Sequence, residues 1–190
     1  MKNFLLFFLL CLTTQCFSAP YLMTSSADCG PAALHAVTDV PEATIESQIG
    51  WNENSPDITD TPAAHFAWLA KQKIAYQNLS MTDVITADKA IPGKTVILIH
   101  SSNDPNSIWG KLKLQSWLNQ HWVVLAGCDG KQISVYWGDS TIKTFSCADF
   151  MTMMTQGGPT NTAYMITPTG TSKPKKWWIL FAALIVKFFK

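Results

Sequence analysis

Two uninterrupted apolar segments in the middle of the chain constrain its fold most. Residues 95–100 read Thr-Val-Ile-Leu-Ile-His, and residues 121–127 read His-Trp-Val-Val-Leu-Ala-Gly. Runs of this length are typical of strands buried inside a sheet. Asp129 and Gly130 give a tight-turn signal after the second run, and residues 132–137 alternate between polar and apolar side chains. The sequence therefore predicts that the second apolar strand returns as a hairpin.

Helical patterns come before these strands. Pro31 suits the first turn of a helix over residues 31–40, in which apolar positions recur at helical spacing. Residues 43–49 are expected to form a short second helix, and residues 61–72 a third that begins at a Thr-Pro pair. His65 lies on this third helix and is interpreted as a surface or edge residue rather than a ligand.

The remaining segments complete one domain of the α+β class. Residues 73–79 and 163–166 are expected to be short strands, and Ser146 with Asp149 is expected to cap a short helix. Helices come first and a mostly antiparallel sheet second, which indicates an α+β fold. A chain of 190 residues is long enough for one domain with a sizeable core.

The two ends differ from this domain, which we assign to residues 19–170. Residues 1–18 have a basic start, an apolar run and small residues, the pattern of a cleaved signal peptide. Residues 171–190 contain a basic, proline-stiffened linker and an apolar segment with paired tryptophans and flanking lysines, which favours a short membrane anchor. An uncleaved N-terminal anchor, and a C-terminal helix that packs on a partner or on the domain itself, are the alternatives. The expected location is periplasmic or otherwise extracytoplasmic, at a membrane.

Charge and cysteine content exclude some classes of protein. The net charge is +1 and only 14% of residues are charged, so no basic face indicates nucleic-acid binding. Cys11 and Cys16 leave with the signal peptide, which leaves an odd number of thiols in an oxidising compartment. One solution is a Cys128–Cys147 disulfide with Cys29 free; the other is three free thiols. The Cys and His residues show no close ligand spacing, so no metal or other cofactor is expected.

Cys29 stands where a reactive thiol is expected. A helix N-terminus lowers the pKa of a thiol, and Gly30 lets another group approach the sulfur. A thiolate nucleophile needs a base and a group that orients the base. His121 begins the buried strand and Asp139 follows the returning strand, so the hairpin places both at the same end. Taken singly, the three residues also fit an inert cysteine, a strand-end histidine and a turn residue.

Together these segments resemble the C39 family of papain-like cysteine peptidases. The motif Asp-Cys-Gly-Pro-Ala-Ala-Leu at residues 28–34, the His-Trp-Val-Val-Leu strand and the Gly-Asp pair at residues 138–139 carry the resemblance, which covers roughly residues 21–154. It implies a papain-like α+β fold with helices packed on a mostly antiparallel sheet. It also implies that Cys29 is the nucleophile, His121 the general base and acid, and Asp139 the residue that orients the imidazole.

The chain departs from the family pattern at the oxyanion hole. The family usually has a Gln six residues before the cysteine, and here that position is Met23, which cannot donate a hydrogen bond. Loss of one such donor typically lowers the rate by about 100- to 1,000-fold. The hydroxyl of Ser25 or Ser26 is the candidate replacement. The best-known members trim leader peptides on the cytosolic side of exporters, a substrate that does not suit an exported chain.

The expected function is therefore that of an exported, membrane-associated cysteine peptidase. It would cleave a peptide or protein substrate through a thioester at Cys29, with an envelope or secretion complex as a possible partner. Two alternatives stay open. One is a catalytically impaired domain that serves as a binding or assembly module of an envelope complex, which Met23 favours. The other is a transpeptidase or acyltransferase that passes the thioester to an amine.

Overall fold

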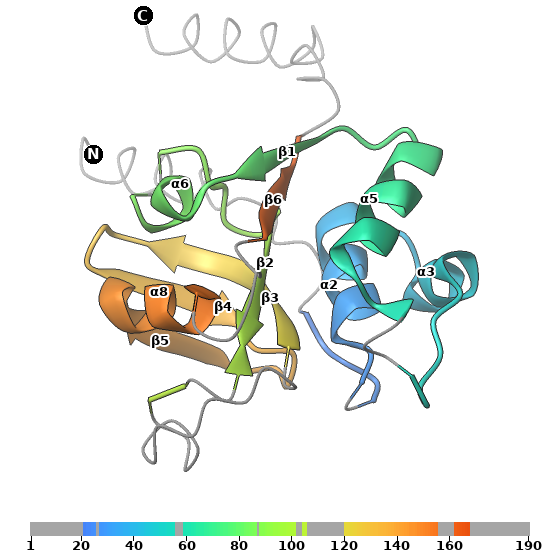
Figure 1. Ribbon diagram of the computed structural model, residues 1–190, viewed down its shortest axis with the longest axis horizontal. Helices are drawn as coiled ribbons and strands as arrows, with labels where there is room; N and C mark the ends of the chain where they lie inside the picture. Colours follow the sequence, from blue (N-terminus) through green and yellow to red (C-terminus); the bar gives the residue numbers. More distant parts are fainter. Residues whose placement is uncertain are drawn as a thin grey trace, which may run out of the picture.

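An antiparallel sheet forms the middle of the molecule (Figure 1). The computed structural model describes residues 21–25, 27–55, 59–86, 88–101, 104–105, 120–155 and 162–167. Six strands pair in the order β1-β6-β2-β3-β4-β5. Their bounds are β1 Tyr76–Leu79, β2 Thr95–His100, β3 Gln120–Cys128, β4 Gln132–Tyr136, β5 Ile142–Ser146 and β6 Ala163–Ile166.

Helices cover both faces of this sheet. On one face lie α2 (Cys29–Thr38), α3 (Glu42–Ile49) and α5 (Pro62–Lys71), and on the other α6 (Met81–Ile85) and α8 (Cys147–Thr155) (Figure 1). This arrangement confirms the predicted α+β class, with N-terminal helices packed on an antiparallel sheet. It also explains why two strands read as continuous apolar runs, because neither face of the central strands meets water.

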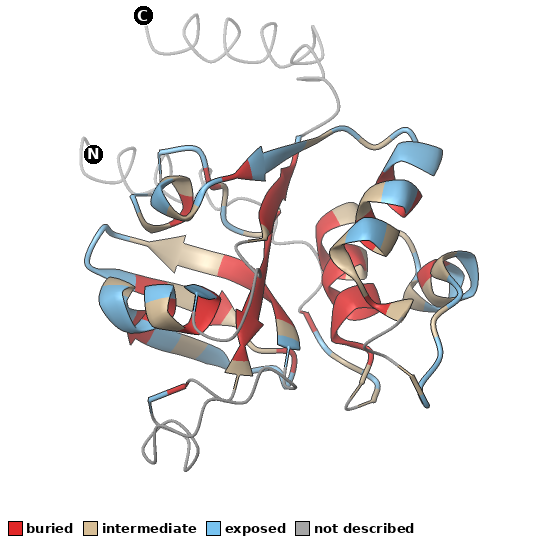
Figure 2. Cartoon of the chain, in the orientation of Figure 1, coloured by how far each residue is buried: buried red, intermediate tan, exposed pale blue. Residues whose placement is uncertain are grey.

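Strand β3 divides its side chains between two cores. Trp122 and Val124 point into the core beneath α2, whereas Val123 and Leu125 point into the core beneath α8. All six residues of β2 are buried, as the red strand at the centre of Figure 2 shows. The predicted hairpin is present, since Val124 pairs with Tyr136 across the turn that follows β3.

Local capping signals form the predicted helix ends. The Thr61 hydroxyl accepts the N–H of Ala64 at 3.2 Å, and Pro62 occupies the first turn of α5. The Ser146 hydroxyl accepts the N–H of Asp149 at 3.1 Å where α8 begins. Two elements, α6 and β5, were not predicted from the sequence. The burial pattern of β5 explains why this strand was not predicted, because only Phe145 of the strand is buried and no apolar run marks it.

The predicted signal peptide and C-terminal anchor fall outside the described residues and stay predictions. Within the described ranges, no helix combines the length and the apolar character needed to cross a bilayer.

Candidate active site

Cys29 is the first residue of α2, and the loop before it is held by Asp28. The Asp28 Oδ2 atom accepts the N–H of Thr24 at 2.9 Å, the hydroxyl of Thr24 at 2.7 Å and the N–H of Ser25 at 2.7 Å. Tyr21 ties the same region to the sheet, because its hydroxyl lies 2.7 Å from the Trp122 carbonyl oxygen and 3.1 Å from that of Cys29. The thiol is thus fixed against the first residues of β3.

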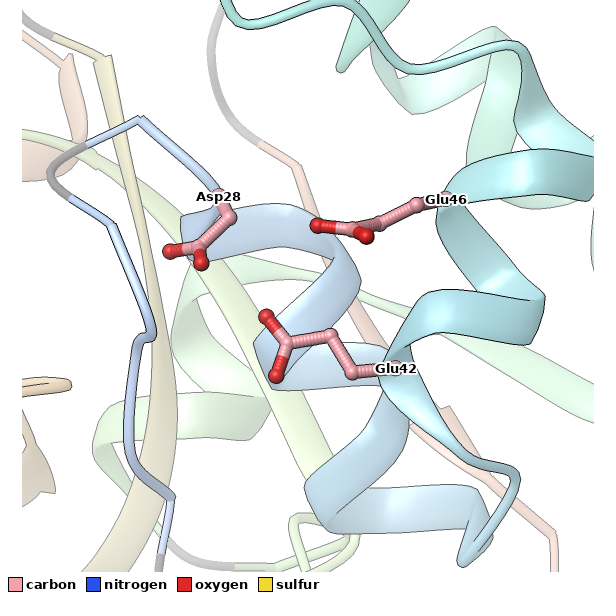
Figure 3. A group of neighbouring side chains, drawn as sticks. All are labelled: Asp28, Glu42 and Glu46. Atoms are coloured by element: carbon pink, nitrogen blue, oxygen red, sulfur yellow. The ribbon is translucent and has the colours of Figure 1, made fainter.

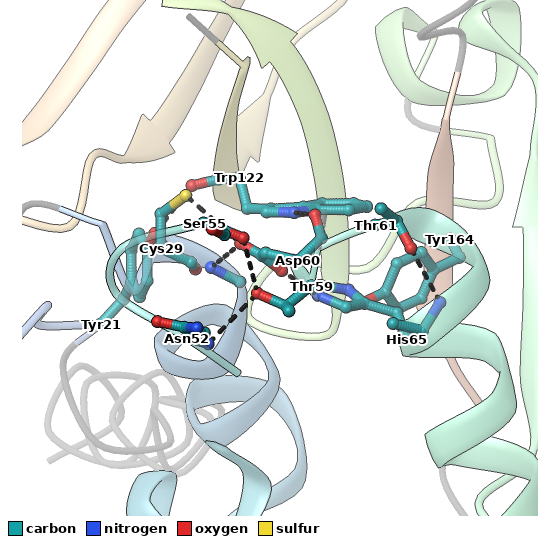
Figure 4. A network of polar contacts seen from close by, with 12 residues as sticks. Tyr21, Cys29, Asn52, Ser55, Thr59, Asp60, Thr61, His65, Trp122 and Tyr164 are labelled. Atoms are coloured by element: carbon teal, nitrogen blue, oxygen red, sulfur yellow. Dashed lines mark hydrogen bonds and ion pairs between the residues drawn. The ribbon is translucent and has the colours of Figure 1, made fainter. Parts of the chain in front are cut away.

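A buried carboxylate lies beside the sulfur (Figure 4). The Cys29 Sγ atom is 3.8 Å from Oδ2 of Asp60, and the same oxygen accepts the Gly30 N–H at 2.9 Å. A Cβ atom at position 30 would come within 1.7 Å of the Asp60 carboxylate. The prediction that Gly30 permits a close approach to the sulfur is confirmed, and the approaching group is the Asp60 side chain.

The expectation that the pKa of Cys29 is lowered is wrong in this environment. Cys29 is only 8% exposed. Burial raises the pKa of Cys29 above its ordinary value, the negative charge of Asp60 raises it further, and a hydrogen bond from the Trp122 backbone acts in the opposite direction. The Gly30 N–H at the positive end of α2 is already paired with the Asp60 carboxylate. At neutral pH Cys29 is a thiol, and it needs a base before it can attack.

The interpretation of His65 as a surface or edge residue is wrong. It is fully buried, with Nε2 2.7 Å from Oδ1 of Asp60 and Nδ1 2.8 Å from the Tyr164 hydroxyl. Its ring stacks on Trp122 with centroids 4.2 Å apart. Sequence spacing could have revealed this burial, since His65 shares one face of α5 with the buried residues Trp68 and Leu69.

His121 lies near the start of β3, next to the residue whose backbone contacts the sulfur. Its Nε2 atom is 2.8 Å from the Trp137 carbonyl oxygen, which can only accept a hydrogen bond. Nε2 therefore carries the proton, and Nδ1 is left with a lone pair. Burial lowers the pKa of His121, which favours the neutral base. Within the described residues, no hydrogen bond joins His121 to Cys29 or to Asp139.

Asp139 lies at the same end of the hairpin as His121, but its carboxylate is engaged elsewhere. It is exposed, and Oδ1 accepts the N–H of Thr141 at 3.0 Å and also the Thr141 hydroxyl. These hydrogen bonds lower the pKa of Asp139 below its ordinary value. In this structure the imidazole of His121 is oriented by the Trp137 carbonyl rather than by the Asp139 carboxylate.

The expected oxyanion region is formed by an extended segment beside Gly138. The Met23 N–H donates to the Gly138 carbonyl at 2.8 Å, and a Cβ at Gly138 would come within 2.5 Å of the Met23 sulfur. The Ser25 hydroxyl accepts the N–H of Ala27 at 3.2 Å. Ser26 lies outside the described residues. Position 23 thus packs against the hairpin end with an apolar side chain.

The other two cysteines are close neighbours. The Cys128 Sγ atom is 3.0 Å from the Ile85 carbonyl oxygen, and Cys147 Sγ is 4.0 Å from the same oxygen. Both are free thiols in this structure, so the disulfide between them stays a prediction.

Comparison with known proteins identifies the fold. No family model matches the chain, and no curated protein sequence matches it significantly. Among solved structures, the chain is similar to the peptidase domain of Streptococcus ComA, a bi-functional ABC transporter involved in a quorum-sensing pathway, with a TM-score of 0.56 and 16% sequence identity. The match covers 78% of this chain and 96% of that domain. The predicted C39-like fold is thereby confirmed.

Proposed function

We propose that this chain is a cysteine peptidase in which Cys29 is the nucleophile and His121 the general base. The observation that carries the proposal is the position of the thiol. Cys29 begins a helix that packs against β3 within a fold similar to a C39 peptidase domain. Its sulfur contacts the backbone of Trp122, which directly follows His121 in the chain, and the Nδ1 atom of His121 carries a lone pair.

The chemistry follows from the protonation states at the site. Nδ1 of His121 removes the Cys29 proton as the sulfur attacks the scissile carbonyl carbon, and the resulting imidazolium returns that proton to the leaving amine. The acyl group stays on sulfur as a thioester, which water hydrolyses with His121 again acting as base. The Trp137 carbonyl holds Nε2 throughout, and the ionised Asp139 favours the imidazolium through its charge.

The oxyanion that develops on the substrate needs hydrogen-bond donors. We assign the Cys29 backbone N–H at the start of α2 to this role, because an N-terminal helix N–H has no partner within its own helix. Met23 supplies no second donor. We therefore expect slow turnover compared with a peptidase that has an amide at this position.

We further propose that the enzyme acts outside the cytoplasm at a membrane surface. The signal-like residues 1–18 and the apolar residues 177–189 support this location. The substrate would then be a peptide or protein that reaches the same membrane, with an envelope complex as the natural partner. Cell fractionation of the full chain and of a chain truncated after residue 176 tests the anchor; recovery of both in the same fraction would contradict it.

A binding or assembly module is the second candidate, favoured by Met23 and by the carboxylate of Asp60 beside the sulfur. Two variants distinguish this candidate from a peptidase. Under this alternative, Cys29→Ala keeps the biological role, while removal of residues 177–190 abolishes it. Transfer of the acyl group to an added amine, in place of hydrolysis, would instead indicate a transpeptidase.

The decisive experiment is labelling by a peptidyl epoxide or chloromethyl ketone. We expect covalent modification at Cys29 and none in Cys29→Ser. In His121→Ala we expect the labelling rate to fall by about 100-fold or more. His35→Ala is the matched control, since His35 lies on the same helix as Cys29 but bonds the Val40 carbonyl. Equal labelling rates in His121→Ala and the control would contradict the assigned base.

A further inference from the structure

Three acidic side chains converge where α2 and α3 meet, next to the candidate active site. Glu42 and Glu46 are one turn apart on α3 and reach toward Asp28, which directly precedes α2 (Figure 3). One carboxylate oxygen from each residue lies within 4.8 Å of those of the other two. Residues four apart on a helix share a face, so α3 itself aligns the two glutamates.

Asp28 directs an oxygen without a partner into this group. The side chain is 0% exposed, and its Oδ2 atom is already bonded by Thr24 and Ser25. Its Oδ1 atom is buried and has no hydrogen-bond partner among the described residues, and Oε1 of Glu42 is in the same situation. Buried carboxylate oxygens in folded proteins are normally paired, so these two atoms leave a place for a ligand that contacts both.

The charge of this cluster is not balanced within the described part of the chain. The ion pairs found there involve other acids, namely Asp60, Asp83 and Asp104. Ionised carboxylates this close repel one another, and a positive ion placed among them would remove that repulsion.

We propose that Asp28, Glu42 and Glu46 bind a Ca²⁺ ion that joins the start of α2 to α3. The donors are all carboxylate oxygens, which hard cations prefer, and no His or Cys of the described residues belongs to the group. Oxygens on opposite sides of a Ca²⁺ ion lie up to about 5 Å apart, given bond lengths of roughly 2.3–2.6 Å. The spacing of 4.8 Å fits that limit.

The sequence analysis predicted no metal site because the Cys and His residues lack close ligand spacing. That spacing carries no information about carboxylates from two separate elements. The ion would hold the residue before Cys29 and thereby stiffen the N-terminus of α2. The site does not depend on the peptidase reaction, and it can be present whether or not Cys29 is catalytic.

Calorimetric titration of the chelator-treated, full-length protein with CaCl₂ tests the proposal directly. We expect saturable binding of one ion, weakened roughly tenfold or more by Glu42→Gln and abolished by Glu42→Gln combined with Glu46→Gln. Asp88→Asn is the control, because it removes an exposed carboxylate outside the cluster. Wild-type protein without saturable heat, or binding that survives in the double variant, would overturn the proposal.

Thermal unfolding gives a second readout that needs no activity. In chelator, the double glutamine variant should melt above the wild type, because it lacks the repulsion among the acids. In Ca²⁺ the order should reverse, since only the wild type binds the ion in its folded state. An identical response of both proteins to Ca²⁺ would show that the cluster is satisfied by a shared proton and would refute the ion site.

Discussion

Replacement of Asp60 by Asn should make Cys29 markedly more reactive. The carboxylate Oδ2 atom lies 3.8 Å from the sulfur, in a buried environment. At an effective dielectric constant of about 20, two unit negative charges at that separation repel by about 4 kcal/mol. Removal of this repulsion favours the thiolate by up to about a thousandfold, since each 1.4 kcal/mol is a factor of ten.

The rate of alkylation should rise less than the thiolate population. A thiolate of lower pKa is a weaker nucleophile, and this offsets about half of the gain on a logarithmic scale. We therefore expect iodoacetamide to modify Cys29 of Asp60→Asn about 30-fold faster at neutral pH. The Asn side chain is nearly isosteric, and its carbonyl oxygen can keep the hydrogen bond from Gly30.

Peptide mass spectrometry after timed alkylation measures this rate at Cys29 alone, and Asp88→Asn serves as the control for loss of one exposed charge. Because burial and Asp60 raise the pKa of Cys29, the wild-type rate should keep rising with pH beyond the range of an ordinary thiol. The variant should level off at lower pH. A wild-type thiol that titrates at or below the ordinary value, or an unchanged rate in the variant, would refute the role given to Asp60.

Three further predictions concern other contacts of the site and the fold. Met23→Gln should raise peptidase turnover, by up to about 100- to 1,000-fold if its amide reaches the oxyanion, and a steady-state assay would show no gain if the residue stays packed on the hairpin. Tyr164→Phe leaves a buried nitrogen of His65 unpaired and should lower the free energy of unfolding by about 1–3 kcal/mol, as measured by urea denaturation. Oxidation should join Cys128 and Cys147 in a disulfide and raise the free energy of unfolding by about 3 kcal/mol. Mass spectrometry should show the loss of two hydrogens, and Cys147→Ser should show neither effect. A protein that keeps both thiols under oxidising conditions would contradict the pairing.

Much of the fold could be predicted because its signals are local. The apolar runs that became β2 and β3 and the hydroxyl caps of α5 and α8 lie in short segments of sequence. Strand β5 escaped prediction because it lies at the edge of the sheet and buries only one side chain, which leaves no periodic pattern to detect.

The candidate site was predicted less completely than the fold. Cys29, His121 and Asp139 lie on the expected elements, and the hairpin brings the last two to one end of the sheet. Their partners differ from expectation, since His121 bonds the Trp137 carbonyl and Asp139 bonds Thr141. Which acceptor a side chain finds at the end of a strand depends on backbone geometry that a motif does not encode.

Local signals were enough to place the two central strands, the hairpin turn, the caps of α5 and α8, and a cysteine at the start of a helix, because those features depend on neighbouring residues. Tertiary packing brought Asp60 to the sulfur of Cys29 and turned Asp28 toward Glu42. His65 holds Asp60 through one ring nitrogen and bonds the Tyr164 hydroxyl through the other. These residues are far apart in the chain, and their charges interact only after packing has excluded water and brought them within a few ångströms of one another.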